Sequence, residues 1–212
     1  MKRGFDLTCY LIAGRSSCGE RPLEEVVRLA VEGGVTMVQL REKDVSTREY
    51  LETAGSLKRI LAPAGVPLII NDRIDVALAV GAEGVHVGQS DMPVDIARRL
   101  MGPDAIIGLS MDTDAQVLEA ETLDVDYLGL GPVFPTNTKA DHSEPLGFEG
   151  FARRRGMTRH PSVAIGSVTA RCAGHLRSLG ADGLAVVSAI CRAEDPAEAA
   201  RELRRAFAEE KE

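Results

Sequence analysis

The residues best suited to chemistry in this 212-residue sequence are polar groups that stand at the ends of short apolar runs or in the long loop after one of them. They include three cations, Arg41, Lys43 and Lys139, and two carboxylates, Asp72 and Asp91, which follow two consecutive runs. Cations and backbone amides bind phosphate oxygens. Two carboxylates without a histidine suit Mg²⁺, which often bridges to a diphosphate. The set therefore indicates a diphosphate–magnesium site opposite a smaller phosphate site.

Other polar residues occupy similar places: Gln39 within the second run, Asn71 after the third, Ser110 ending the fifth, Ser167 after the seventh and Ser188 after the eighth. Each has an ordinary alternative explanation when taken alone. An Asp at a strand end often caps the next helix, and a lone arginine often forms a surface ion pair. His86 is expected within the fourth run as a packed, hydrogen-bonded side chain. Together, however, these residues are expected to share one rim of the fold, and that shared position favours a ligand site.

The elements that would position these residues alternate along the chain. Continuous apolar runs favour strands buried on both faces, as in a parallel sheet, and alternation with amphipathic stretches favours βαβ units. Eight such units predict a closed (β/α)8 barrel, whose active site lies at the carboxyl ends of the strands. The expected strands are 7–12, 37–40, 67–70, 84–87, 105–109, 127–130, 162–165 and 183–187, and the expected helices are 23–32, 47–62, 73–80, 94–101, 112–121, 148–155, 173–179 and 196–209.

An open doubly wound sheet is the structural competitor. It usually carries GxGxxG after its first strand, and residues 14–19 do not match that pattern. Ser46 and Asp195 are expected to cap the helices that follow them. The longest segment without regular structure, residues 131–147, contains the string PTNTK and is expected to be a loop that covers a ligand.

Composition predicts one globular domain, residues 1–212, with an aliphatic core, because 44% of the residues are hydrophobic and Trp is absent. The net charge of −7 argues against a nucleic-acid partner, and the run 153–155 is expected to be a solvated helix face. No signal peptide is recognisable, and no apolar run approaches the roughly 20 residues that span a membrane. Four scattered cysteines without CxxC spacing indicate reduced thiols in the cytoplasm.

Four strings together resemble the thiamine-phosphate synthase family: VQLREKD, IINDRIDVALAVGAEGVHVGQSDMP, GLGPVFPTNTK and GADGLAVVSAI. The resemblance runs from about Leu23 to the end of the chain. It implies a TIM-barrel transferase that condenses hydroxymethylpyrimidine diphosphate with thiazole phosphate, giving thiamine phosphate and pyrophosphate.

The resemblance also implies residue roles. Mg²⁺ would be held by Asp72 and Asp91, and Arg41, Lys43, Ser110 and Lys139 would be catalytic. The pyrimidine diphosphate would be bound by Gln39, Arg41, Lys43, Asn71, Ser110 and Lys139, with Leu40 and Glu42 beside them. The thiazole phosphate would be bound by Thr136, Thr138, Ser167, Val187 and Ser188, with Asn137 among them.

The chain departs from the family pattern at three places. Ser110-Met111-Asp112 replaces the usual Ser-x-His, so that Asp112 stands in place of the histidine. Ser167 replaces the second glycine of Ile-Gly-Gly, and residues 11–14 lack the usual Thr-Asp. We expect Ser167 to have a φ below zero, which a side chain tolerates.

Two other functions stay open. One is a related thiazole tautomerase, an isomerase that would need no diphosphate–Mg²⁺ site, and the other is a non-catalytic barrel that binds thiamine precursors. A homo-oligomer is also left open, and no nucleic-acid or membrane partner is expected.

Overall fold

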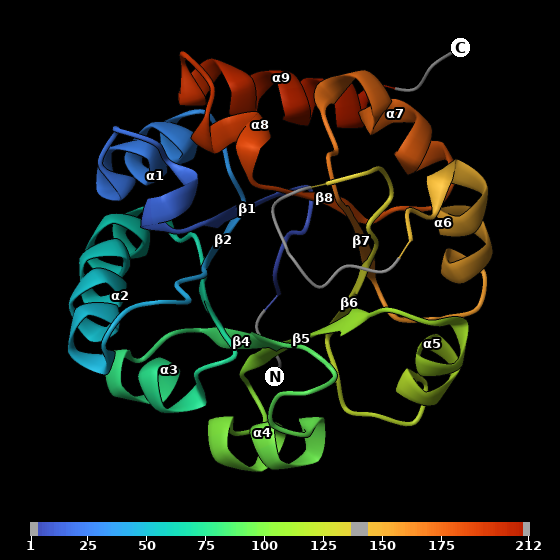
Figure 1. The fold of residues 1–212 in the computed structure, drawn as a ribbon, viewed down its shortest axis with the longest axis horizontal. Coiled ribbons are helices and arrows are strands. Elements are labelled where there is room, and N and C mark those ends of the chain that lie inside the picture. Colours follow the sequence, from blue (N-terminus) through green and yellow to red (C-terminus); the bar gives the residue numbers. More distant parts are fainter. Residues whose placement is uncertain (1–3, 137–143, 210–212) are drawn as a thin grey trace.

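Eight parallel strands form one closed barrel in the computed structural model, which describes residues 4–136 and 144–209. Each strand pairs with the next along the chain, and β8 closes on β1. The expected (β/α)8 fold is confirmed, and Figure 1 looks into the barrel with the helices around it. The strands are β1 (Cys9–Ala13), β2 (Met37–Leu40), β3 (Leu68–Asn71), β4 (Gly84–Val87), β5 (Ile106–Met111), β6 (Tyr127–Leu130), β7 (Ser162–Ile165) and β8 (Gly183–Val186).

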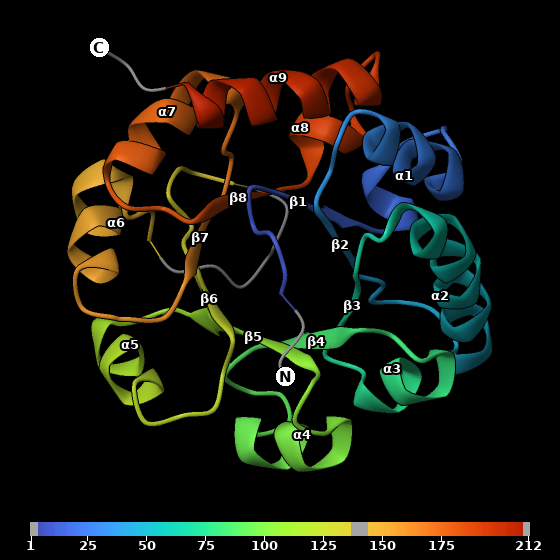
Figure 2. The same cartoon turned by 180° about the vertical axis from the view of Figure 1, so that it is seen from behind.

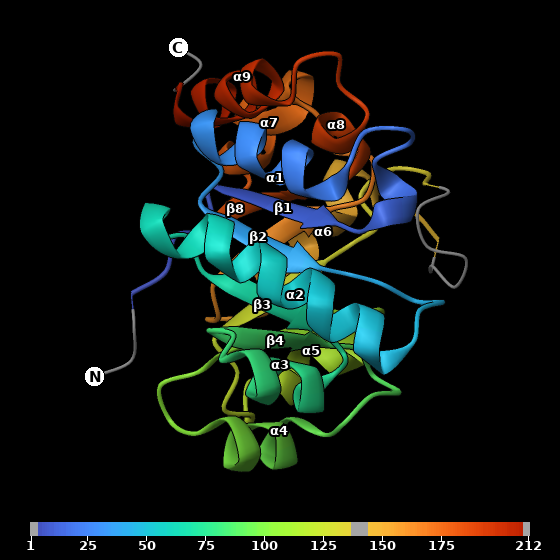
Figure 3. The same cartoon turned by 90° about the vertical axis from the view of Figure 1, so that its left-hand side faces the viewer.

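The helices pack on the outer surface of the barrel, as the side view in Figure 3 shows. Every expected helix is present, and the short helix after β8 is additional, because four residues are too few for a recognisable period. Within the described residues no helix is long and apolar enough to cross a membrane. The helices are α1 (Leu23–Glu32), α2 (Thr47–Leu61), α3 (Ile74–Val80), α4 (Val94–Met101), α5 (Asp114–Ala120), α6 (Gly147–Arg155), α7 (Ala170–Ser178), α8 (Ser188–Cys191) and α9 (Pro196–Ala208), with 3₁₀ turns η1 (Arg15–Ser17) and η2 (Ala62–Ala64).

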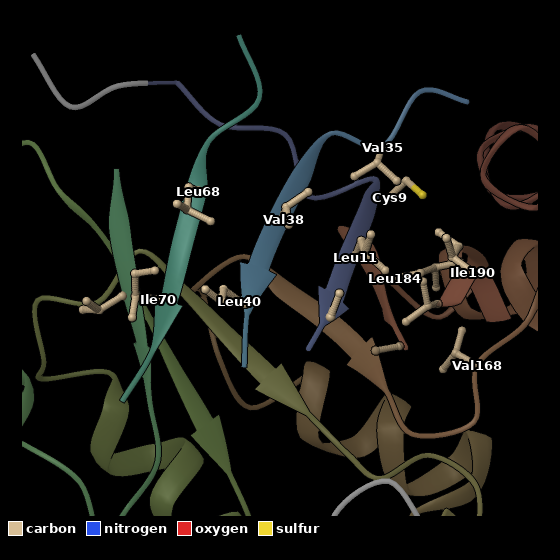
Figure 4. Packing of buried hydrophobic residues seen from close by; sticks show 14 of the residues in the cluster. Cys9, Leu11, Val35, Val38, Leu40, Leu68, Ile70, Val168, Leu184 and Ile190 are labelled. Carbon is tan, nitrogen blue, oxygen red and sulfur yellow. The ribbon is translucent and has the colours of Figure 1, made fainter. Parts of the chain in front are cut away.

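Both faces of the strands are buried, which explains their continuous apolar sequence. Alternate residues point inward, where Tyr10, Met37 and Tyr127 belong to a cluster within the barrel. The intervening residues, such as Leu11 and Val38, join a larger cluster between the strands and the helices (Figure 4). The inward positions at the carboxyl ends are therefore where polar residues stand out.

The N-terminal segment crosses the amino end of the barrel, as Figure 2 shows from behind. Leu7 is buried in the inner cluster, and the ring of Phe5 lies 6.1 Å from that of Tyr127. This packing fills the amino end of the interior with apolar side chains. The polar residues expected to bind ligands lie toward the opposite end, where the strands finish.

The expected helix caps are confirmed. The hydroxyl of Ser46 accepts a 3.3 Å hydrogen bond from the Glu49 N–H, and the Glu49 carboxylate accepts one of 2.9 Å from the Ser46 N–H. The Asp195 carboxylate accepts from the N–H groups of Ala197 and Glu198 at 2.9 and 3.0 Å. These bonds satisfy amides that the first helical turn leaves without partners.

The arginine run in α6 corrects an expectation, because one of its members is buried. Arg154 is 6% exposed, and its guanidinium donates to the Asp114 carboxylate at 2.9 Å and to the Asp112 carbonyl at 2.8 Å. Arg153 is exposed, as expected of a solvated face. Arg154 instead fastens α6 to the connection between β5 and α5, which compensates the burial of its charge.

Candidate active site at the carboxyl ends of the strands

The carboxylates of Asp72 and Asp91 lie together in the loops that follow β3 and β4. Burial, and then the hydrogen bond between the two carboxyl groups, raises the pKa of Asp91 above its ordinary value. Lys43 reaches the pair from the loop after β2, with its Nζ 2.6 Å from an Asp72 oxygen. The Asp91 carboxylate also accepts a 2.8 Å hydrogen bond from the Gly88 N–H. The structure thus places Lys43, Asp72 and Asp91 together at one rim of the barrel.

The backbone of Asp72 adopts an uncommon conformation that directs this carboxylate. Its φ is +61°, in the left-handed region that Asp and Asn enter more easily than other non-glycine residues. The Asp72 N–H donates to the His86 carbonyl at 2.9 Å, and the Asn71 side-chain amide donates to the Asp72 carboxylate. Neighbouring groups thus hold a costly local conformation, which is a recurrent feature of functional sites.

The carboxylate pair is the best candidate for a metal site. No group of three or more His, Cys, Asp or Glu side chains in the described part of the chain could hold a metal ion. A cation at Asp72 and Asp91 would therefore take its remaining ligands from water and substrate. Mg²⁺ is commonly bound in this way, by one or two carboxylates and phosphate oxygens. The two like charges in contact also favour a cation between them.

A hollow of about 370 Å³ opens between the ends of β1, β2 and β8. It brings together three residues that the sequence analysis assigned to substrates, Arg41, Val187 and Ser188. The hollow is also lined by Ile12, Ala13, Gly14, Ser16, Ser17 and Arg192.

The contribution of the loop after β1 to this hollow was not predicted from the sequence. Arg192, just after α8, donates from Nε to the Ser17 carbonyl at 2.6 Å and from Nη2 to the Ser16 carbonyl at 3.0 Å. It thereby fixes the 3₁₀ turn η1 at the edge of the hollow. The available signal was position alone, since η1 follows β1 as other candidate residues follow their strands.

The loop after β6 is fastened to the end of β7, and this contact places Pro135, the residue before Thr136, against Ser167. The N–H groups of Val133 and Phe134 donate to the carbonyls of Ile165 and Gly166 at 2.8 and 3.2 Å. The Ser167 hydroxyl extends the row by donating to the Pro135 carbonyl at 2.6 Å.

The expectation for the Ser167 backbone is wrong, because its φ is +50° rather than negative. A left-handed conformation costs a residue with a Cβ about 1–2 kcal/mol. The hydrogen bond from the hydroxyl to Pro135 explains how serine is held there. The hydroxyl is therefore occupied within the protein, and the part of Ser167 left for a ligand is its backbone N–H.

Gln39 and Ser110 are linked through the barrel interior. Gln39 Nε2 donates to Tyr10 Oη at 2.6 Å, and Tyr10 Oη lies 2.7 Å from Tyr127 Oη. Tyr127 Oη lies 3.0 Å from His86 Nδ1, whose Nε2 lies 2.9 Å from Ser110 Oγ. His86 is thus hydrogen-bonded inside the barrel, as expected. The two tyrosines were missed because a tyrosine within an apolar strand is typical of a core residue.

The side chains of Leu40 and Glu42 are directed elsewhere. Leu40 is fully buried in the cluster between strands and helices, so its side chain is separated from the rim. The Glu42 carboxylate accepts a 2.8 Å hydrogen bond from the Arg15 N–H, which connects the loops after β1 and β2. The remaining candidates Asn137, Thr138 and Lys139 lie outside the described residues.

Two departures from the family pattern have local structural explanations. A Cβ at Gly14 would lie 2.2 Å from the Arg41 carbonyl oxygen, so this approach of β1 to β2 requires glycine. Asp112 leads into α5, where its N–H donates to Gln116 Oε1 at 2.7 Å and its carbonyl accepts from Arg154. Neither departure disturbs the carboxylate pair.

Comparison with known proteins identifies relatives over most of the chain. Residues 9–190 match the family model described as thiamine monophosphate synthase. The thiamine-phosphate synthase of Albidiferax ferrireducens is 54% identical over 198 residues, covering 93% of this chain and 90% of that protein. The one from Vibrio parahaemolyticus is 53% identical over 181 residues, covering 85% and 89%.

Solved structures agree with these relatives. The thiamine phosphate pyrophosphorylase of Pyrococcus furiosus superposes with a TM-score of 0.85 at 38% identity, and the match covers 95% of each chain. A 3-hexulose-6-phosphate synthase superposes with a TM-score of 0.71 at 18% identity, covering 95% of this chain and all of that one, and this second likeness concerns the fold alone.

Proposed function

This chain belongs to the thiamine monophosphate synthase family, and we propose that it joins hydroxymethylpyrimidine diphosphate to thiazole phosphate with the help of Mg²⁺. The products are thiamine phosphate and pyrophosphate. The observation that supports this function most directly is the contact of Asp72, Asp91 and Lys43, two anions and a cation at one rim.

Asp72 and Asp91 are the proposed Mg²⁺ ligands. Their oxygen-only donor set fits a hard cation. Burial, and after it the contact with Asp72, raises the pKa of Asp91. When bound, the metal supplies positive charge that neutralises the diphosphate oxygens.

The diphosphate is proposed to bind at Arg41, Lys43, Asn71 and Lys139, with Gln39 and Ser110 on the pyrimidine. The cations stabilise the negative charge that collects on the leaving diphosphate. Asn71 is buried beside Asp72, so it can orient the carboxylate as well as offer its amide.

The thiazole phosphate is proposed to bind at the opposite side of the rim, at Thr136, Asn137, Thr138, Ser167, Val187 and Ser188. The loops after the seventh and eighth strands commonly bind phosphate in barrels of this kind. Two observations support this placement: Val187 and Ser188 line the hollow beside Arg41, and Ser167 fastens the loop that carries Thr136.

The proposed reaction breaks one bond and forms one. The bond between the pyrimidine methylene carbon and the diphosphate oxygen breaks, and its electron pair leaves with pyrophosphate. The electron-rich aminopyrimidine supports the transient positive charge on the methylene carbon. The lone pair of the thiazole nitrogen then forms the new C–N bond, and the positive charge passes to the thiazolium ring. No side-chain nucleophile is required.

The setting of the reaction is proposed to be the cytoplasm, with small molecules as partners. All four cysteines are free thiols, which is the usual state in a reducing compartment. The net charge of −7 disfavours a nucleic-acid partner.

A turnover assay with both substrates and Mg²⁺ tests the proposed function. We expect thiamine phosphate and pyrophosphate in equal amounts, and neither product when one substrate is omitted. A tautomerase would isomerise a thiazole phosphate without releasing pyrophosphate, and a non-catalytic barrel would bind ligands without product. Either of those outcomes would overturn the proposal.

A further inference from the structure

A continuous row of polar groups crosses the interior of the barrel from β2 to β5. It runs from Gln39 through Tyr10, Tyr127 and His86 to Ser110, with successive heavy-atom distances of 2.6, 2.7, 3.0 and 2.9 Å. Both of its ends are residues proposed to contact the pyrimidine. The three middle side chains have no role in the reaction as described so far.

The hydrogen atoms in this row can be assigned in sequence from the Gln39 end. Burial raises the pKa of Tyr10 and of Tyr127 above their ordinary values, so each keeps one phenol proton. Tyr10 accepts from Gln39 Nε2, and its own proton therefore goes to Tyr127. Tyr127 then donates to His86 Nδ1, which leaves the proton of a neutral imidazole on Nε2, facing Ser110.

This assignment fixes what the two ends can offer a ligand. In the part of the chain that the structure describes, the bond to Tyr10 is the one hydrogen bond of the Gln39 side chain, which is 2% exposed. Its carbonyl oxygen is thus a buried acceptor left for a ligand. Ser110 Oγ accepts from His86, so its own proton is left to donate. Reversing the Gln39 carboxamide would reverse every bond and exchange the two roles.

We propose that Tyr10, Tyr127 and His86 are positioning residues that make Gln39 an acceptor and Ser110 a donor for the aminopyrimidine. An aminopyrimidine carries N–H donors on its amino group and lone-pair acceptors on its ring nitrogens, so its pattern complements this pair. The inference rests on the proposed function, and it adds to that function a source of selectivity for the amino group.

Gly108 provides independent support, because it makes room for the row. A Cβ at Gly108 would lie 2.4 Å from both His86 Nδ1 and Tyr127 Oη, at the bond between them. At Gly129, on the next strand, a Cβ would lie 3.5 Å from His86 Cε1, which is ordinary contact. A side chain is therefore incompatible with the row at one of these two neighbouring glycines and compatible at the other.

Binding measurements on Tyr127→Phe test the proposal, because this change removes one oxygen and keeps the ring. The probes are hydroxymethylpyrimidine monophosphate and its counterpart without the amino group, titrated by calorimetry. The wild-type protein should prefer the amino ligand by roughly 10- to 100-fold, and Tyr127→Phe should reduce that ratio to about threefold or less. The KM for thiazole phosphate should change little.

Ser162→Ala is the matched control for the loss of a buried hydroxyl. Ser162 lies at the amino end of β7 and donates to the His160 carbonyl at 3.1 Å, apart from the row. It should keep the wild-type preference. Tyr10→Phe should reduce the preference for the amino ligand as much as Tyr127→Phe does. The double variant should reduce it no further than either single change, because each change interrupts the same row.

The two glycine positions give a second comparison. Gly108→Ala should lose the preference for the amino ligand, and Gly129→Ala should retain it. An unchanged preference in folded Tyr127→Phe or Tyr10→Phe, or equal losses for both substrates, would overturn the positioning role. A wild-type protein that binds no pyrimidine phosphate and forms no product would instead overturn the proposed function itself.

Discussion

The Nζ atom of Lys43 lies 2.6 Å from an Asp72 carboxylate oxygen, so a cation proposed to bind diphosphate also neutralises a proposed Mg²⁺ ligand. Half of the Lys43 side chain is exposed, and Asp72 is 21% exposed, so the pair sits where solvent and substrate can reach it. Lys43 can therefore exchange Asp72 for a phosphate oxygen. Metal and diphosphate would then bind cooperatively. A metal ion on Asp72 would free Lys43 for the diphosphate, and a diphosphate on Lys43 would free Asp72 for the metal ion.

Lys43→Met should change the binding of Mg²⁺ and of diphosphate in opposite directions. Loss of the competing charge should tighten Mg²⁺ binding in the absence of substrate by about 1 kcal/mol, roughly fivefold. The KM for pyrimidine diphosphate should rise by roughly tenfold or more, because a charge-assisted contact is lost. Calorimetry and steady-state kinetics measure the two effects. Lys58→Met, which breaks the Lys58–Glu83 pair instead, should alter neither quantity.

Asp91→Asn should abolish Mg²⁺-dependent turnover without lowering the Tm of the metal-free protein. Asparagine keeps an acceptor for the Gly88 N–H and removes the repulsion from Asp72. Asp75→Asn is the control, because Asp75 is an exposed carboxylate paired with Arg73. Wild-type turnover in Asp91→Asn at low Mg²⁺ would remove the metal assignment.

The same pair predicts how stability depends on pH. The pKa of Asp91 is raised in the folded protein by burial and by Asp72, so the fold favours its protonated form. That contribution to stability is complete below the unfolded pKa of about 3.9 and is lost as the pH rises through the raised value. Mg²⁺ binds the ionised pair, so the Mg²⁺-induced rise in Tm should be largest at neutral pH and fade on acidification. A rise independent of pH would contradict this account.

The fold was predictable because each strand is apolar on both faces and each helix on one. Eight alternating runs leave little choice of architecture, and the ends of β2, β3 and β4 then bring Lys43, Asp72 and Asp91 to one rim. What escaped prediction depends on contacts that only closure of the barrel creates. Arg192 meets Ser17 across 175 positions of sequence, and no local pattern marks that contact.

Conformation at single residues was also beyond the sequence. Serine is compatible with either sign of φ, and the bond between Ser167 and Pro135 exists only once the loop after β6 lies along β7. The tyrosines inside the barrel are hidden for a different reason. A phenol ring satisfies the apolar pattern of a strand, and its hydroxyl becomes informative only when its neighbours on other strands are known.

Ser167→Gly and Ser167→Ala should differ in stability. Glycine relieves the left-handed strain and loses the hydrogen bond to Pro135, so the two changes offset within about 1 kcal/mol. Alanine loses the bond and keeps the strain, so it should be less stable than glycine by about 1–2 kcal/mol. Denaturant titration measures this difference, and equal stabilities would contradict it. The thiazole phosphate KM of Ser167→Gly should change only modestly, because the backbone N–H remains.

Arg192→Ala should weaken substrate binding with little effect on folding. Its two hydrogen bonds hold η1 at the edge of the hollow, and the arginine itself is exposed. We expect KM for the ligand that fills this hollow to rise by roughly tenfold, equivalent to about 1.4 kcal/mol. Arg21→Ala is the control, since Arg21 binds the carbonyls of Ala193 and Glu194 and does not line the hollow. Equal effects of the two changes would remove the special role of Arg192.

Replacing Arg41 and replacing Lys43 should affect the binding of the two substrates to different degrees. Arg41 shares its hollow with Val187 and Ser188, which are proposed to bind the thiazole phosphate, whereas Lys43 lies at the carboxylate pair. Lys43→Ala should therefore raise the KM for pyrimidine diphosphate and leave that for thiazole phosphate almost unchanged. Arg41→Ala should also raise the KM for pyrimidine diphosphate more than the KM for thiazole phosphate. The ratio of these two increases should be smaller than in Lys43→Ala. Steady-state kinetics with each substrate varied in turn measures both ratios. Identical ratios for the two variants would mean that the hollow and the carboxylate pair form one undivided site.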